Sequence, residues 1–74
     1  MVKVRVDDDV VVTGDFFMHP EEEVEAVEEL LSEHVDDTVE EIEEGVRRYL
    51  DANDIELLGV SARDLAELTV EAGR

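Results

Sequence analysis

The chain has 74 residues, with 23 Asp and Glu against 6 Lys and Arg and a formal net charge of −17. A chain this short forms one domain without room for the deep cleft of an independent enzyme, and its charge argues against nucleic-acid and membrane-surface partners. It holds no cysteine, which excludes disulfides and thiolate chemistry. It has no apolar run long enough for a membrane span and no hydrophobic leader, so we expect a soluble, cytoplasmic protein.

The acidic residues are unevenly distributed along the chain. Residues 6–46 hold 17 acidic side chains and no Lys or Arg. The Debye length is about 10 Å at 0.1 M salt and about 3 Å near 1 M, so molar salt removes most of the repulsion among such charges. The composition therefore predicts a halophilic protein, in which the acidic runs at residues 7–9 and 21–23 form a solvated surface rather than cation sites.

The first half of the chain predicts a hairpin followed by a helix. Valines alternate with cations over residues 2–6, and the β-branched run Val10–Thr13 follows the acidic triplet that we predict as the turn. A first helix is predicted from about Pro20 to His34, because Pro suits the first helical position and the apolar residues that follow recur at helical spacing.

The second half predicts two further helices around a short strand. A capping box with Asp37 as the cap begins the second helix, which ends near Asn53. Gly45 lies inside this helix, where glycine is unfavourable. Either another backbone approaches closely there, or the glycine arose by sequence drift and has no structural role. Residues 55–60 predict a short strand, and Ser61–Asp64 resembles the cap of a third helix.

The order of these elements predicts an α+β fold. We expect a small antiparallel sheet, made of the hairpin plus a short third strand, packed on one side by about three helices. Residues 1–74 form a single domain in this interpretation. Phe16, Phe17 and Tyr49 are expected to fill the space between the layers, and with only three aromatic residues the core is modest and its stability at low salt marginal.

No motif predicts a catalytic or metal site. The hydroxyl residues lie outside any strained elbow or Gly-rich turn, and His19 and His34 lack the spacing of a metal pair. Lys3 fits poorly as the modified lysine of a swinging-arm carrier, because it lies within a predicted strand. We interpret Lys3 and Arg5 as charges on the outer face of an edge strand or, alternatively, as part of a docking patch.

The run Thr13–Glu21, T-G-D-F-F-M-H-P-E, is the most distinctive segment. Gly14 allows a backbone angle or a close approach that other residues forbid. Phe16 and Phe17 could both fill the core while Asp15 hydrogen-bonds to nearby amides. Alternatively, one Phe and Asp15 face outward and anchor a partner.

This run, together with the valine hairpin before it and the later segment I-E-L-L-G-V-S-A-R-D-L, resembles the carboxyl-terminal accessory domain of lipoate-protein ligases. It looks most like the archaeal form that exists as a separate small subunit. The resemblance extends from Lys3 to about Thr69, and its specific part is the G-D-F-F corner. It implies partner-binding positions at Gly14, Asp15, Phe16, Phe17, His19 and Pro20. The family motif matches Gly59, Val60 and Leu65 more loosely.

The resemblance implies a non-catalytic accessory subunit that joins a catalytic lipoate-protein ligase subunit. In that role it enables ATP-dependent activation of lipoate to lipoyl-adenylate, whereas transfer to the lysine of a carrier domain depends on it less. Lipoate, ATP and Mg²⁺ are then expected on the catalytic partner and not on this chain, and lipoyl-carrier proteins are indirect partners. The alternative is a stand-alone protein–protein interaction or regulatory module of an unrelated enzyme in a halophile.

Overall fold

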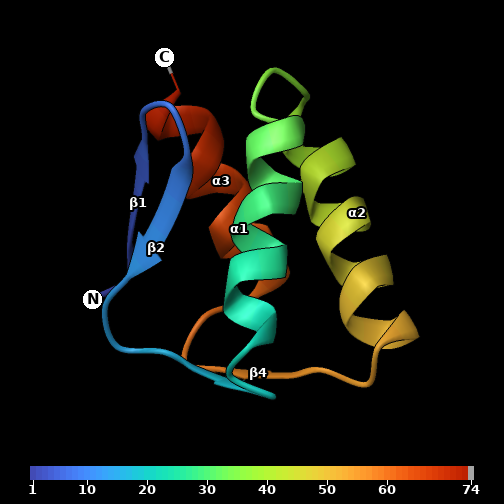
Figure 1. The fold of residues 1–74 in the computed structure, drawn as a ribbon. Helices are drawn as coiled ribbons and strands as arrows, with labels where there is room; N and C mark the ends of the chain where they lie inside the picture. The colour runs from blue at the N-terminus through green and yellow to red at the C-terminus, as the bar shows by residue number, and fades with distance from the viewer. Residues whose placement is uncertain (74) are drawn as a thin grey trace.

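Helices and two short antiparallel sheets share one core in the computed structural model, which describes residues 1–73 (Figure 1). The hairpin lies along one side of the helices, and the second sheet closes the end of the helical layer. This arrangement confirms the predicted α+β class. In chain order the elements are β1 (Lys3–Val6), β2 (Val10–Thr13), β3 (Phe17–His19), α1 (Glu23–Glu33), α2 (Val39–Ala52), β4 (Glu56–Leu58) and α3 (Ala62–Ala72).

The first sheet is the predicted hairpin of β1 and β2. The strands pair antiparallel with Val4 opposite Val12 and Val6 opposite Val10, and the acidic triplet makes the turn, in which the Asp7 N–H donates to the Asp9 carbonyl at 3.1 Å. Side chains alternate between the two faces of a strand. These four valines therefore turn toward the helices, while the cations of β1, on the opposite face, are exposed.

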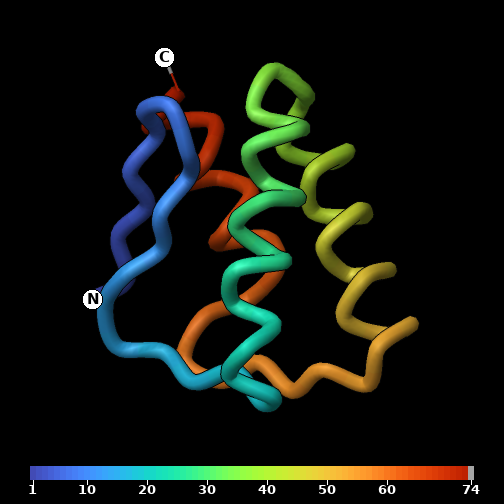
Figure 2. The backbone as a smooth tube through the Cα atoms, viewed as in Figure 1, coloured from blue at the N-terminus to red at the C-terminus, as the bar shows by residue number. Residues whose placement is uncertain are grey.

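The predicted third strand does not join this hairpin. Strand β4 pairs instead with β3, a three-residue strand that the sequence analysis did not anticipate, and together they form a separate ribbon below the helices (Figure 2). Helix α1 covers the open edge of β2, where the Glu28 carboxylate accepts the Val12 N–H at 2.8 Å, and β1 contacts α3. Both flanks of the hairpin are therefore occupied by helices.

Helix α1 begins three residues later than predicted. The segment from Pro20 to Glu22 forms a turn, in which the Glu23 N–H donates to the Pro20 carbonyl and the Val24 N–H to the Glu21 carbonyl, both at 3.1 Å. The helix ends at Glu33, next to the predicted end.

The caps of the other two helices are well defined. Thr38, not the predicted Asp37, caps α2, because its hydroxyl accepts the Glu41 N–H and the Glu41 carboxylate accepts the Thr38 N–H, each at 3.3 Å. Asp37 contacts His34 Nδ1 at 2.7 Å instead. The predicted helix end near Asn53 and the predicted capping box at Ser61 are both confirmed.

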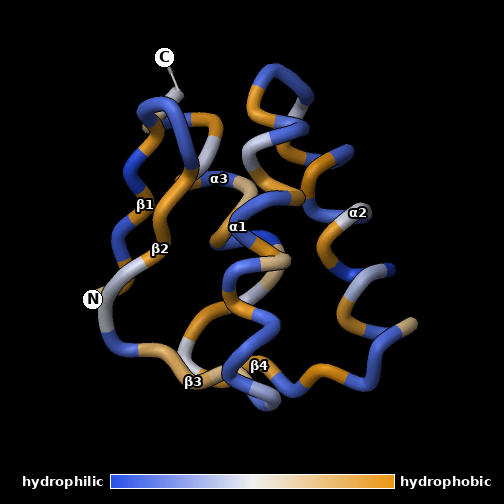
Figure 3. Tube along the Cα trace, viewed as in Figure 1, coloured by the Kyte–Doolittle hydropathy of each residue, from blue (hydrophilic) through white to orange (hydrophobic). Residues whose placement is uncertain are grey.

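The core lies between the valine face of the hairpin and helices α1 and α3, and it continues between these two helices and α2. Apolar positions of α2 lie on the side toward α1 (Figure 3). The buried hydrophobic residues are Val10, Val12, Met18, Val27, Leu31, Ile42, Val46, Ile55, Ala62, Leu65 and Ala66. Among residues 1–73 no helix is long and apolar enough to cross a membrane.

One expectation about the interior is wrong, and one that was left open is decided. Phe16 and Tyr49 are half-buried against the core, but Phe17 is exposed, because the alternation of β3 turns its neighbour Met18 inward. Of the two explanations for Gly45, a close approach by another backbone is excluded, because a Cβ placed there would have no atom of another described segment within 4 Å.

Candidate protein-interaction site

Two glycines shape the corner that carries the distinctive run. Gly14 has φ +120°, and a Cβ there would collide with the carbonyl oxygen of Met1. Gly59 has φ +85°, and a Cβ there would lie 2.8 Å from the carbonyl oxygen of Asp15. A residue with a side chain is strained in both conformations. The glycines therefore let the β2–β3 loop approach both the start of the chain and the β4–α3 loop.

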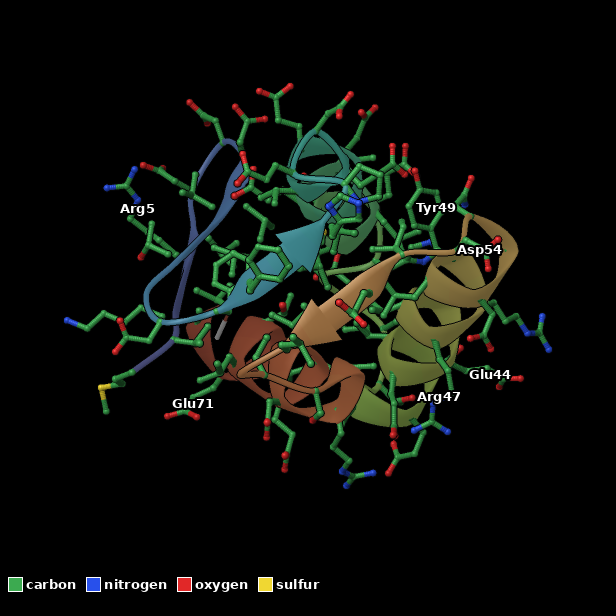
Figure 4. The ribbon with its side chains drawn as sticks, turned by 90° about the horizontal axis from the view of Figure 1, so that it is seen from below. Arg5, Glu44, Arg47, Tyr49, Asp54 and Glu71 are labelled. Carbon is green, nitrogen blue, oxygen red and sulfur yellow. The ribbon has the colours of Figure 1, made fainter. Side chains whose placement is uncertain are left out.

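Strands β3 and β4 form a ribbon beyond this corner, which crosses the near side of the molecule when seen from below (Figure 4). Phe17 is directly opposite Leu58, and Met18 is opposite Leu57. Phe17 is 47% exposed and Leu58 54%, whereas Met18 is 4% exposed. We call the outward side of this ribbon, formed by Phe17, His19, Glu56 and Leu58, the ribbon face.

His19 extends the apolar surface of the ribbon face. Its ring lies parallel to that of Phe17, with an interplanar angle of 6° and ring centroids 6.4 Å apart, and it is opposite Glu56 in the ladder. Aromatic rings with one polar edge are common in protein interfaces because they bury a large area and still satisfy a hydrogen bond.

Asp15 lies between Gly14 and the ribbon and holds the start of the chain. Its Oδ2 accepts a hydrogen bond from the amino-terminal ammonium of Met1 at 2.8 Å. This hydrogen bond, assisted by the positive charge of the ammonium group, lowers the pKa of Asp15 below its usual value. The carboxylate is therefore ionised at neutral pH, and it is exposed at the corner.

The six residues predicted as a partner-binding site thus have different positions. Only Phe17 and His19 present their side chains on the ribbon face. Phe16 packs against the core, and Pro20 lies half-buried in the turn before α1. Gly14 and Asp15, described above, support the corner through backbone shape and charge.

The sequence analysis missed Leu58 as a site residue. The sequence signal that could have identified it is the pair Leu57-Leu58 just before Gly59. Two adjacent residues of a strand point to opposite faces, so one of these two leucines must face outward. Across residues 1–73 the exposed large hydrophobic residues are Met1, Phe17 and Leu58. All three belong to segments that meet at the two glycines. Phe17 and Leu58 are paired directly across the ribbon, and we interpret this exposed apolar pair on an acidic chain as a candidate interaction site.

A hollow of about 400 Å³ lies beside α3, next to the corner. It is lined by Val2, Gly59, Val60, Leu68 and the carboxylates of Asp64, Glu67 and Glu71. Within the described residues, no group of three or more His, Asp or Glu side chains is placed to hold a metal ion.

Comparison with models of known protein families, with curated proteins and with solved structures found no match.

Proposed function

We propose that this chain is the non-catalytic accessory subunit of a split lipoate-protein ligase and works in the cytoplasm. It binds the catalytic subunit through the ribbon face and enables ATP-dependent activation of lipoate to lipoyl-adenylate, before the lipoyl group is transferred to a carrier lysine. The observation that carries the proposal is the outward position of Phe17. This residue belongs to the G-D-F-F corner in which the resemblance to these accessory domains is most specific.

A small domain without catalytic groups promotes adenylation by changing the conformation of its partner. A ligand shifts a conformational equilibrium only by its difference in affinity for the two states. The accessory subunit therefore binds the state in which the nucleotide-binding loop of the catalytic subunit is closed and ordered. Lipoate, ATP and Mg²⁺ bind to the catalytic subunit in this proposal.

The ribbon face supplies an apolar centre but not a whole interface. Phe17 and Leu58 are each about half exposed, so burying what remains of each contributes about 1 kcal/mol. Stable complexes bury about 800 Å² on each partner. The ribbon face is therefore the centre of a larger contact in which neighbouring surfaces also take part.

The test is lipoylation of a carrier protein by the catalytic subunit in molar KCl, with and without this chain. One series begins from free lipoate with ATP, and a second begins from ready-made lipoyl-adenylate. We expect only the first series to require this chain. Phe17→Ala should weaken binding to the catalytic subunit and lower the first rate by about tenfold. Arg48→Ala, an exposed change on α2, should match the wild type.

Two outcomes would contradict the proposal. If neither series responds to a chain that is demonstrably folded, the accessory role is wrong and an interaction module for an unrelated enzyme replaces it. If both series respond equally, the chain assists transfer rather than activation of lipoate.

A further inference from the structure

The Lys and Arg side chains of residues 1–73 fall into two groups. On α2 and α3, Arg47 contacts Glu43 and Arg48 contacts Glu44, both at 2.7 Å, and Arg63 contacts Glu43 at 3.3 Å. On β1, Lys3 and Arg5 have no carboxylate within 4.0 Å among residues 1–73. This is unusual in a chain with 23 acidic residues and 6 Lys and Arg.

The two cations without a partner share one face of the hairpin. Lys3 is opposite Thr13 and Arg5 is opposite Val11, and none of these cross-strand neighbours is acidic. We call the surface formed by Lys3, Arg5, Val11 and Thr13 the cation face. Arg5 extends away from the body of the protein when the molecule is seen from below (Figure 4). The cation face is thus a small cationic surface on a strongly anionic molecule.

The Gly14 corner links the cation face to the ribbon face along the chain. Thr13, at one end of the hairpin ladder, is followed directly by the corner at Gly14 and then by β3, which begins at Phe17. The start of the chain joins the same corner through the contact between the Met1 ammonium and Asp15. A partner that covers the corner can therefore reach both faces at once.

The spacing of the cations indicates what they can bind. Residues two apart in a strand are separated by about 6–7 Å and point to the same side. Two carboxylates on a facing surface can pair with two such cations, and complementary charge around an apolar centre sets the orientation and the partner choice of an interface. In molar salt only charges in direct contact interact strongly. Pairs at the interface itself then matter more than the overall charge of −17.

We propose that the cation face docks against a carboxylate-bearing surface of the catalytic subunit, next to the apolar site that receives Phe17 and Leu58. This inference rests on the proposed function and names the chemistry of the partner surface. Nucleic acid is a poor occupant, because its continuous phosphate charge would meet the dense carboxylates that surround this small face.

Lys3 makes a direct test possible because it is the only lysine of the chain. A carbodiimide forms an amide bond between an amine and a carboxylate only where the two are in contact. The complex of this chain with the purified catalytic subunit is treated in molar KCl and analysed by peptide mass spectrometry. We expect a crosslink between Lys3 and an Asp or Glu of the catalytic subunit, and its loss in Lys3→Arg, which keeps the charge but removes the amine.

Binding of variants to the same subunit supplies the second measurement. Lys3→Glu combined with Arg5→Glu should raise the dissociation constant by at least about tenfold, and Lys3→Gln combined with Arg5→Gln by a smaller factor. Arg48→Glu is the matched control, since it reverses an exposed cation on α2, and it should change the constant by less than about twofold. Circular dichroism in the same buffer establishes that each variant is folded.

The outcomes separate this inference from the proposed function. If the wild-type chain binds and activates the catalytic subunit but the double reversal binds equally well, the cation face is not part of the interface and the proposed function stands. If Lys3 crosslinks only to carboxylates of this chain or of a second copy of it, the catalytic subunit does not contact the cation face and this inference is wrong. If the wild-type chain does not bind the catalytic subunit at all, the proposed function and this inference both fail.

Discussion

Tyr49, near the end of α2, donates a hydrogen bond of 2.9 Å to the carboxylate of Glu23, the first residue of α1. The two residues are 26 positions apart in the chain, and their contact joins two helices that pack side by side. The carboxylate that accepts this hydrogen bond stabilises the protonated phenol. The pKa of Tyr49 is therefore raised above its ordinary value of 10.0, with smaller contributions from burial and from the charges of Glu23 and Glu29.

This contact predicts a loss of stability in alkaline solution. The folded state holds the phenolic proton more tightly than the unfolded state, so the stabilising effect is complete below about pH 10 and is lost as the pH rises through the raised value. Tyr49→Phe should lower the melting temperature at neutral pH and give a smaller decline above pH 10 than the wild type. Thermal melts of both proteins from pH 7 to 11 measure this, and identical alkaline declines would show that the hydrogen bond does not form.

Substitution of the two adjacent residues Phe17 and Met18 of β3 is predicted to destabilise the fold to very different degrees. Met18→Ala removes a side chain that is 4% exposed and should cost about 2–5 kcal/mol. Phe17→Ala removes a larger side chain from the ribbon face and should cost less than about 1 kcal/mol. Urea unfolding of the two variants at one salt concentration makes the comparison. Unfolding of Phe17→Ala would place this residue in the core and remove the basis of the ribbon face.

The helices and the hairpin could be predicted from the sequence because their signals are local. The valine alternation before the acidic triplet and the apolar spacing of each helix come from neighbouring residues, and the structure follows them. The cap of α2 was misplaced by one position, since both Asp37 and Thr38 have a Glu three residues later. The capping-box pattern alone does not show which of these two residues is the cap.

The second sheet and the ribbon face could not be predicted, because they depend on a distant pairing. Strands β3 and β4 have three residues each, too few for an alternation to be recognised. The register that places Phe17 opposite Leu58 links segments about 40 residues apart. A shift of one residue exchanges the two faces of a strand, so the sequence left open which phenylalanine is exposed.

The cap of α2 gives a prediction that compares the two candidate residues directly. Thr38→Ala removes the hydroxyl that accepts the Glu41 N–H and should cost about 1 kcal/mol. Asp37→Ala removes only a partly exposed contact with His34 and should cost less than about 0.5 kcal/mol. Urea titrations followed by circular dichroism measure both. A larger loss for Asp37→Ala would mean that Asp37 caps the helix in solution.

The charge of the chain predicts that salt stabilises its fold. Few cations offset the carboxylates, and the five ion pairs that arginine side chains and the amino terminus form within residues 1–73 leave most of the acidic side chains without a cationic partner. Raising KCl from 0.1 M to 3 M screens this repulsion and should raise the melting temperature by about 10 °C or more.

Matched variants separate screening from the general effect of salt on hydrophobic burial, which raises the stability of every variant alike. Replacing Asp7, Asp8 and Asp9 in the hairpin turn with Asn removes three neighbouring charges, so this variant should be more stable than the wild type at 0.1 M KCl and gain less from added salt. Equal melting temperatures of the wild type at the two concentrations would mean that carboxylate repulsion does not limit stability. The halophilic interpretation of the composition would then be wrong.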